Sequence, residues 1–134
     1  MVEETKACNG LNMNICMSYG SRSEIVNASR ELISDVLNGQ VQMESINEDE
    51  FEKRLLTNRC GDGGSGVGSG GTGSGDPDVL LRTSGEVRIS NFLLWQLAYT
   101  EMFFLNKSWP EIEKDDLLSI IRSYAKGRIR RYGR

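Results

Sequence analysis

The chain has 134 residues, which is enough for one domain with a single hydrophobic core. Its composition, 38% hydrophobic and 26% charged, is ordinary for a globular protein, and a net charge of −3 gives no global attraction to nucleic acid. The chain has no histidine, and Cys8, Cys16 and Cys60 lack the spacing of metal ligands, so the sequence argues against a zinc site and a disulfide framework. No run of residues reaches the ~20 apolar positions of a membrane-spanning helix.

The first part of the chain is predicted to form a strand followed by a helix. Apolar residues alternate with polar ones from Leu11 to Met17, a pattern typical of a strand with one apolar face. After a turn at residues 19–21, apolar side chains recur at helical spacing and predict a helix over residues 22–38. Gly39 suits the position just beyond this helix, where a left-handed backbone is common.

A second helix and a glycine-rich segment follow. The helix is predicted over about residues 48–57, with Asn47 and Glu50 forming a capping box at its start. Nine of the fifteen glycines then lie within residues 60–76, among serines and without apolar periodicity. This composition predicts a flexible insertion. A glycine-rich phosphate loop is the alternative, although the GxxxxGKS/T pattern is absent.

The rest of the chain alternates between strands and helices. Short apolar runs predict strands at residues 79–81 and 101–104, with a helix over residues 91–99 between them. A turn at Trp109–Pro110 leads to a last helix over about residues 115–132. Strands that alternate with helices indicate an α/β fold with a mostly parallel sheet and flanking helices.

Polar residues suited to binding an anion concentrate just after the strand at residues 79–81. Arg82 and Arg88 supply guanidinium groups, which hold phosphate oxygens through paired, charge-assisted hydrogen bonds. A Thr83–Gly85 turn and the Ser90 hydroxyl lie nearby, just before a predicted helix whose first turn offers unpaired N–H groups. Ligands of α/β sheets bind beyond the carboxyl ends of the strands. The combination predicts a phosphate-type anion site at a strand–helix junction.

Each of these residues also has a purely structural interpretation. Glu86 can pair with Arg82 or Arg88 at the surface, where ion pairs are weak. Ser90 can serve only as the N-cap of the predicted helix, with Asn91 as a competing cap. The residues by themselves therefore predict an anion site without identifying the anion.

The order of residues in the C-terminal half resembles the signature of the cis-prenyltransferases, the undecaprenyl and dehydrodolichyl diphosphate synthases. The matching motifs are Asp76-Pro77-Asp78, Arg82-Thr83-Ser84-Gly85-Glu86-x-Arg88-x-Ser90-Asn91-Phe92-Leu93-Leu94-Trp95-Gln96, Ala98-Tyr99-Thr100-Glu101 and Trp109-Pro110. Two weaker matches flank these motifs: Asn14 to Arg22, where Ser21 replaces a second glycine, and Arg131-Tyr132-Gly133.

The resemblance implies a reaction and a set of site residues. Arg82, Arg88 and Ser90 would bind the diphosphate of isopentenyl diphosphate. Glu101 would supply a carboxylate to Mg²⁺, a cation that prefers oxygen ligands. The implied reaction joins isopentenyl diphosphate to an allylic diphosphate, such as farnesyl diphosphate, and builds a long-chain cis-polyprenyl diphosphate of the kind that leads to dolichol.

The resemblance also implies partners. Arg131 and Gly133 would lie near a subunit interface and help complete a neighbouring subunit's site, in a homodimer or a heteromer. No nucleic-acid partner is expected. The basic residues from Arg122 onward permit peripheral membrane association, or form only a solvated helix end. The cysteine content fits a reducing compartment, so we expect a cytoplasmic or endoplasmic-reticulum-associated protein, with a plastid location left open.

Residues 1–134 resemble only the C-terminal part of one cis-prenyltransferase domain. The family's N-terminal half carries a Met-Asp-Gly-Asn-Gly-Arg-Trp segment whose aspartate works at the metal and the allylic diphosphate, and the sequence has no counterpart. We therefore expect an incomplete sheet and no turnover by these residues alone. The alternative interpretations are a non-catalytic accessory subunit that lends residues 131–133 to a catalytic partner, and an inert remnant of such an enzyme.

Overall fold

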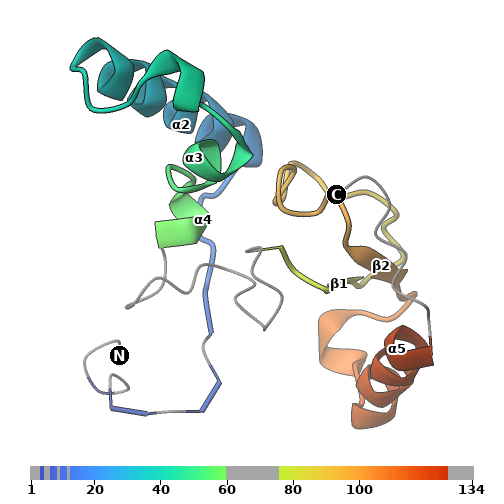
Figure 1. The fold of residues 1–134 in the computed structure, drawn as a ribbon. Coiled ribbons are helices and arrows are strands. Elements are labelled where there is room, and N and C mark those ends of the chain that lie inside the picture. The colour runs from blue at the N-terminus through green and yellow to red at the C-terminus, as the bar shows by residue number, and fades with distance from the viewer. Residues whose placement is uncertain (1–3, 5–6, 9, 12, 60–75, 127–134) are drawn as a thin grey trace.

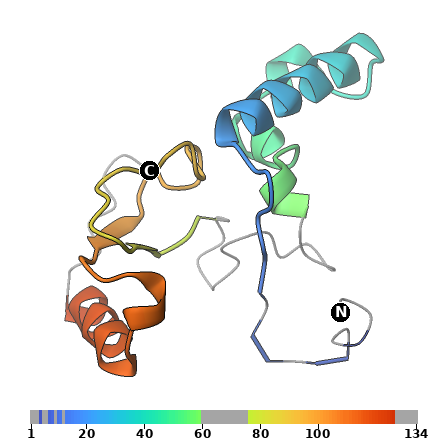
Figure 2. The same cartoon turned by 180° about the vertical axis from the view of Figure 1, so that it is seen from behind.

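The computed structural model describes residues 4, 7, 8, 10, 11, 13–59 and 76–126 of the chain. Figure 1 and Figure 2 show the first three labelled helices lying together, with both strands and the last helix forming a second group. The parallel strands and the helices confirm the predicted α/β class. In chain order the elements are α2 (Ser21–Leu37), the 3₁₀ helix η1 (Met43–Ser45), α3 (Glu48–Glu52), α4 (Leu56–Arg59), β1 (Val79–Arg82), β2 (Glu101–Phe104), the 3₁₀ helix η2 (Trp109–Glu111) and α5 (Lys114–Lys126).

Strands β1 and β2 are the two predicted apolar runs, and they pair in parallel. The register sets the first residue of β1 opposite the first of β2 and the last opposite the last. Backbone bonds extend the pairing at both ends. Glu101 N donates to Asp78 O at 3.1 Å, and Leu105 N donates to Arg82 O at 2.8 Å. The chain is therefore held in place up to Arg82, the last residue of β1.

Helix α2 has the length and the end that its sequence predicts. Gly39 has a φ of +71°, which confirms the left-handed residue just beyond the helix. The opposite end begins at Ser21, one residue before the predicted start. The buried positions recur every three or four residues, as expected for an amphipathic helix; they are Ser21, Glu24, Ala28 and Leu32.

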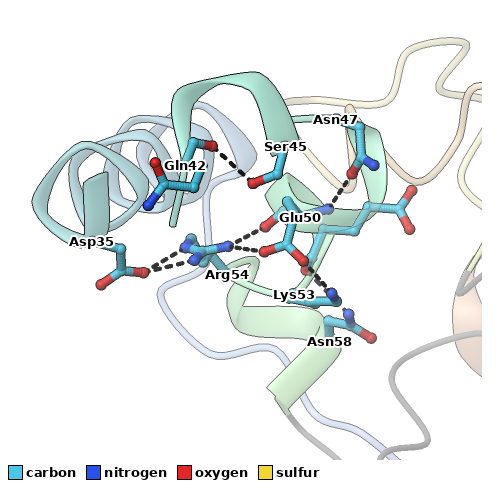
Figure 3. Close-up of polar contacts among 9 residues, drawn as sticks. Asp35, Gln42, Ser45, Asn47, Glu50, Lys53, Arg54 and Asn58 are labelled. Carbon is cyan, nitrogen blue, oxygen red and sulfur yellow. Dashed lines mark hydrogen bonds and ion pairs between the residues drawn. The ribbon is translucent and has the colours of Figure 1, made fainter. Parts of the chain in front are cut away.

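The second predicted helix is divided into two shorter helices, α3 and α4. Asn47 Oδ1 accepts a hydrogen bond from Glu50 N at 2.9 Å, so half of the predicted capping box is present. The Glu50 carboxylate instead pairs with Lys53 and Arg54, which hold its pKa below the ordinary value, Lys53 contributing most. Arg54 Nε also donates to Asp35 Oδ2 of α2 at 2.9 Å (Figure 3). Arg54 thereby joins the turn after α3 to α2.

The strand predicted from Leu11 to Met17 is wrong for the part that is described. Residues 11 and 13–17 adopt neither helix nor strand. A strand is stable only when its backbone groups pair with a neighbouring strand, and the sheet of the described residues contains only β1 and β2. Met13 and Met17 remain 71% and 83% exposed, so the alternating apolar face is also uncovered.

The helix predicted over residues 91–99 is also wrong, because this segment forms consecutive turns. Ser90, Asn91 and Leu93 have φ values of +48°, +63° and +46°, a left-handed backbone that a right-handed helix does not contain. The segment makes hydrogen bonds to α2 instead: Asn91 O accepts from Ser21 N at 2.8 Å. The crossover between the two parallel strands is therefore a turn-rich segment attached to α2.

Two further predicted segments are described only in part. Helix α5 begins at Lys114, one residue before the predicted start, and the predicted residues after Lys126 lie outside the described ones. Residues 60–75 of the predicted insertion also lie outside them, whereas Asp76 is buried. Among the described helices, none combines the length and the apolar character needed to cross a membrane.

Candidate functional site

Arg82 and Ser90 come together at the carboxyl end of β1. Arg82 Nη1 donates to Ser90 Oγ at 3.0 Å, although the two residues are eight positions apart. The parallel pairing fixes the backbone of Arg82, so its guanidinium starts from a rigid position. A guanidinium and a hydroxyl in contact offer several converging donors, which is what an anion of several oxygens requires.

The turn after β1 is attached to the segment after β2. Ser84 and Gly85 have φ values of +66° and +69°. Ser84 N donates to Lys107 O at 2.7 Å, and Gly85 N donates to Leu105 O at 2.9 Å. A Cβ atom at Gly85 would lie 2.8 Å from Asn106 Oδ1, so this position needs glycine for its space as well as its φ.

Arg88 lies on the surface beside Glu86. The Nη1 atom of Arg88 is 2.5 Å from Glu86 Oε2, and its side chain is 66% exposed. Of the two ion pairs predicted for Glu86, the structure therefore contains the one with Arg88. An exposed ion pair contributes little stability, so Arg88 can exchange Glu86 for a more highly charged anion at small cost.

Glu101 does not converge with Arg82 in the paired strands. The register sets Glu101 opposite Val79, three residues before Arg82, or about 10 Å along the strand at ~3.3 Å per residue. Because side chains alternate between faces, an offset of three residues also places Glu101 and Arg82 on opposite faces. Among the described residues, no group of three or more Asp, Glu, Cys or His residues could hold a metal ion.

Ser90 and Asn91 were predicted as alternative N-caps of a helix at residues 91–99. No helix begins there, so neither residue has that role. Ser90 Oγ accepts from Arg82, as described above. Asn91 caps α2 instead: its Oδ1 accepts from Arg22 N at 2.9 Å, and its backbone O accepts from Ser21 N at 2.8 Å. Two motifs 69 residues apart in the sequence are thus joined at one helix end.

A buried carboxylate lies one turn further along α2 and escaped the sequence analysis. Glu24 is 6% exposed, and its Oε1 accepts from both N and Oγ1 of Thr57 at 2.9 Å. Its Oε2 accepts from Tyr19 Oη and from Gln96 Nε2, the latter at 3.4 Å. A detectable signal was present, since Glu24 falls on the face of α2 that carries the apolar Ala28 and Leu32.

The Glu24 network changes the acidity of Tyr19. Burial of the phenol, followed by its hydrogen bond to Glu24, raises the pKa of Tyr19 from 10.0 to about 12. The phenol therefore remains a hydrogen-bond donor at any physiological pH. Aromatic contacts continue from here into the turn-rich segment, since the Tyr19 and Phe92 rings meet edge to face with centroids 5.8 Å apart.

Two hollows adjoin these contacts. A cavity of about 10 Å³ beside Trp95 and Gln96 has room for about one water, so it is too small for a diphosphate. An open hollow of about 320 Å³ lies along the first turns of α2. Arg22 and Arg30 line it, and Arg22 N bonds to Asn91. The larger hollow is therefore positively charged and begins next to the turn-rich segment.

The fold and these contacts define an α/β protein with a guanidinium and a hydroxyl in contact at the end of a parallel strand. A family model described as putative undecaprenyl diphosphate synthase matches residues 1–133, and the chain belongs to this family. The family predicted from the sequence motifs is thus confirmed. Arg131 and Gly133 lie outside the described residues, so their part in a site remains a prediction.

Several curated relatives and solved structures are similar to this chain. Isoprenyl transferase 1 of Tropheryma whipplei is 41% identical over 132 residues, 98% of this chain and 47% of its own length. The tritrans,polycis-undecaprenyl-diphosphate synthase of Pyrococcus furiosus is 44% identical over 130 residues, 97% of this chain and 44% of its own length. The chain therefore spans about half the length of these relatives.

The structural likeness agrees with the sequence likeness. Lavandulyl diphosphate synthase from Lavandula x intermedia, solved in complex with dimethylallyl diphosphate, matches with a TM-score of 0.76 and 35% identity over 92% of this chain and 48% of that one. A probable undecaprenyl diphosphate synthase from Campylobacter jejuni matches with a TM-score of 0.69 and 28% identity, over 96% of this chain and 50% of its own. The described residues therefore correspond to a substantial part of that fold.

Proposed function

We propose that this chain is part of a cis-prenyltransferase and carries its binding site for isopentenyl diphosphate. The whole enzyme would join isopentenyl diphosphate to an allylic diphosphate, such as farnesyl diphosphate, with release of pyrophosphate. The product would be a long-chain cis-polyprenyl diphosphate of the kind that leads to dolichol. The observation that carries the proposal is the contact between Arg82 and Ser90 at the strand end, in a chain of this family.

Each side chain of the site has a distinct part in this proposal. Arg82 extends from a fixed backbone and donates to the diphosphate, with Ser90 Oγ–H as a neighbouring donor. Arg88 leaves Glu86 and adds a second guanidinium. These groups neutralise the diphosphate and orient it, so that its prenyl carbon meets the allylic partner in a productive geometry.

Mg²⁺ is part of the proposal, with Glu101 as one ligand. Mg²⁺ is commonly held by one or two carboxylates together with phosphate oxygens and waters, so a single carboxylate fits this cation. When bound, it would neutralise charge on phosphate oxygens. Because no group of three or more Asp, Glu, Cys or His residues among the described ones could hold a metal ion, we place the other ligands of such an ion outside the described residues.

The partners proposed for the chain are the two prenyl diphosphates and another cis-prenyltransferase subunit, in a homodimer or a heteromer. Residues 131–133 would lie at that interface. We propose peripheral membrane association on the basis of the basic residues from Arg122 onward. We propose a cytoplasmic or endoplasmic-reticulum-associated location on the basis of the cysteine content.

Calorimetric titration of the full chain with isopentenyl diphosphate tests the proposed site. We expect saturable binding, a loss of at least about tenfold in affinity for Arg82→Met, and a smaller loss for Arg88→Met, because each removes charge-assisted bonds. Arg122→Met is the matched control, since Arg122 is an exposed arginine on α5 that takes no part in the contacts of Arg82, Ser90, Glu86 and Arg88. Equal affinities for Arg82→Met and Arg122→Met would show that Arg82 does not bind the diphosphate.

A further inference from the structure

We infer that Asn91 is a positioning residue for the diphosphate site: by capping α2 it holds Ser90 in the conformation that meets Arg82. The inference rests on the proposed function, because it explains how the proposed binding site is kept in shape. Asn91 itself need not touch the ligand. Its effect passes through its neighbour Ser90 and through the backbone that both share.

The backbone around Asn91 is held in an unfavourable conformation. Ser90, Asn91 and Leu93 all have positive φ, which non-glycine residues rarely adopt because Cβ crowds the following carbonyl. Three such residues within four positions persist only when surrounding contacts over-determine them. The conformation of Ser90 is therefore not a local preference and has to be imposed from elsewhere.

The contacts that impose it come from the first turn of α2. Asn91 Oδ1 accepts from Arg22 N at 2.9 Å, and Asn91 O accepts from Ser21 N at 2.8 Å. Ser21 is fully buried, and its Oγ accepts in turn from Leu94 N at 2.9 Å. The turn-rich segment is thus attached to the helix end on both sides of Leu93.

Gly20 shows how closely the two parts fit. A Cβ atom at Gly20 would lie 2.8 Å from Asn91 Nδ2, which is closer than real Cβ contacts allow. The φ of Gly20 is −152°, an extended backbone that alanine also adopts, so the obstacle to alanine among the described residues is Asn91. The Asn91 amide cannot move aside without weakening its bond to Arg22 N.

This fit allows a test that leaves Arg82 and Ser90 unchanged. The test measures the affinity of the full chain for inorganic pyrophosphate by titration calorimetry. The variants are Gly20→Ala, which pushes on Asn91, Asn91→Gly, which removes the cap, and the double variant. Gly10→Ala is the control, because a Cβ atom at Gly10 would meet no described residue within 4 Å. All titrations are made at a temperature where the circular dichroism of each variant matches that of the original chain. A change in affinity then cannot result from unfolding of the variant.

We expect Gly20→Ala and Asn91→Gly each to weaken pyrophosphate binding by about tenfold, because small displacements of positioned groups are costly. The double variant should bind no more weakly than Asn91→Gly alone, since the added methyl group then meets no side chain. Gly10→Ala should bind as the original chain does.

The outcomes separate the inference from the proposed function. If the original chain does not bind pyrophosphate, the diphosphate site fails and the inference falls with it. If the original chain binds and Asn91→Gly binds equally well, only the positioning role is overturned. Fully additive losses in the double variant would also overturn it, because the two changes would then act through different contacts. If Gly20→Ala does not fold, Asn91→Gly alone decides, because it introduces no group that could clash.

Discussion

Tyr19 shows at the scale of one residue how a half-buried hydroxyl can serve a buried network. Its hydroxyl donates to the buried Glu24 carboxylate, whose other donors are Thr57 and Gln96. These residues come from three separate parts of the chain. Removing one of these donors would leave an oxygen of the buried Glu24 carboxylate less satisfied, which costs stability.

The raised pKa of Tyr19 predicts a specific dependence of stability on pH. Because its pKa is 10.0 when unfolded and about 12 when folded, its contribution is fully present below pH 10 and is lost between pH 10 and 12. We expect Tyr19→Phe to lower the free energy of unfolding by about 1 kcal/mol at pH 8. We also expect it to flatten the decline above pH 10. Urea unfolding of both proteins across this range is the measurement, and parallel curves would contradict the prediction.

The end of α2 permits a matched test at the scale of one element. Gly39 has a φ of +71°, and Gly39→Ala should lower the free energy of unfolding by about 1 kcal/mol. Gly10→Ala is the control, because a Cβ atom at Gly10 would meet no described residue within 4 Å and the φ of Gly10 is not positive, so the change should alter stability by less than about 0.5 kcal/mol. Equal effects of the two changes, measured by urea unfolding, would mean that the turn at Gly39 is not formed in solution.

The comparison of predicted and observed elements separates local from tertiary causes. Helix α2, both strands and the turn glycine at residue 39 follow from periodicity and turn chemistry, which act within a few residues. The helix predicted at residues 91–99 is replaced by turns with positive φ at Asn91 and Leu93, and Asn91 is hydrogen-bonded to α2, some 70 positions earlier in the chain. The strand predicted at Leu11 fails because a pattern cannot supply a pairing partner.

The candidate site likewise has features that the local sequence predicts and features that only tertiary contacts determine. The arginines and Ser90 are recognisable from residue type and spacing, and the structure brings Arg82 and Ser90 into contact. The cap that Asn91 places on α2 was not predictable, because nothing local links it to Arg22. The offset of Glu101 from Arg82 follows only from the strand register, which cannot be determined from the sequence alone.

At the scale of the whole molecule, the described residues leave much of their apolar surface uncovered. Among the described residues six apolar side chains are buried, whereas seventeen large ones are exposed, among them Leu37 at 81% and Trp109 at 71%. Exposed apolar side chains, where they gather, are available to an interaction surface or to aggregation. The chain also spans about half the length of its relatives. We therefore predict that the purified 134-residue chain forms no polyprenyl diphosphate from farnesyl and isopentenyl diphosphates with Mg²⁺.

A chimeric enzyme tests most directly whether this chain is equivalent to part of a cis-prenyltransferase. In the isoprenyl transferase of Tropheryma whipplei, the stretch that matches this chain over 132 residues would be replaced by the chain itself. Incorporation of labelled isopentenyl diphosphate into long-chain product would then be measured, with and without Arg82→Met. We expect product from the chimera, none from the isolated chain, and at least a tenfold loss with Arg82→Met. A folded chimera without incorporation, or one indifferent to Arg82→Met, would contradict the assignment of the diphosphate site to this chain.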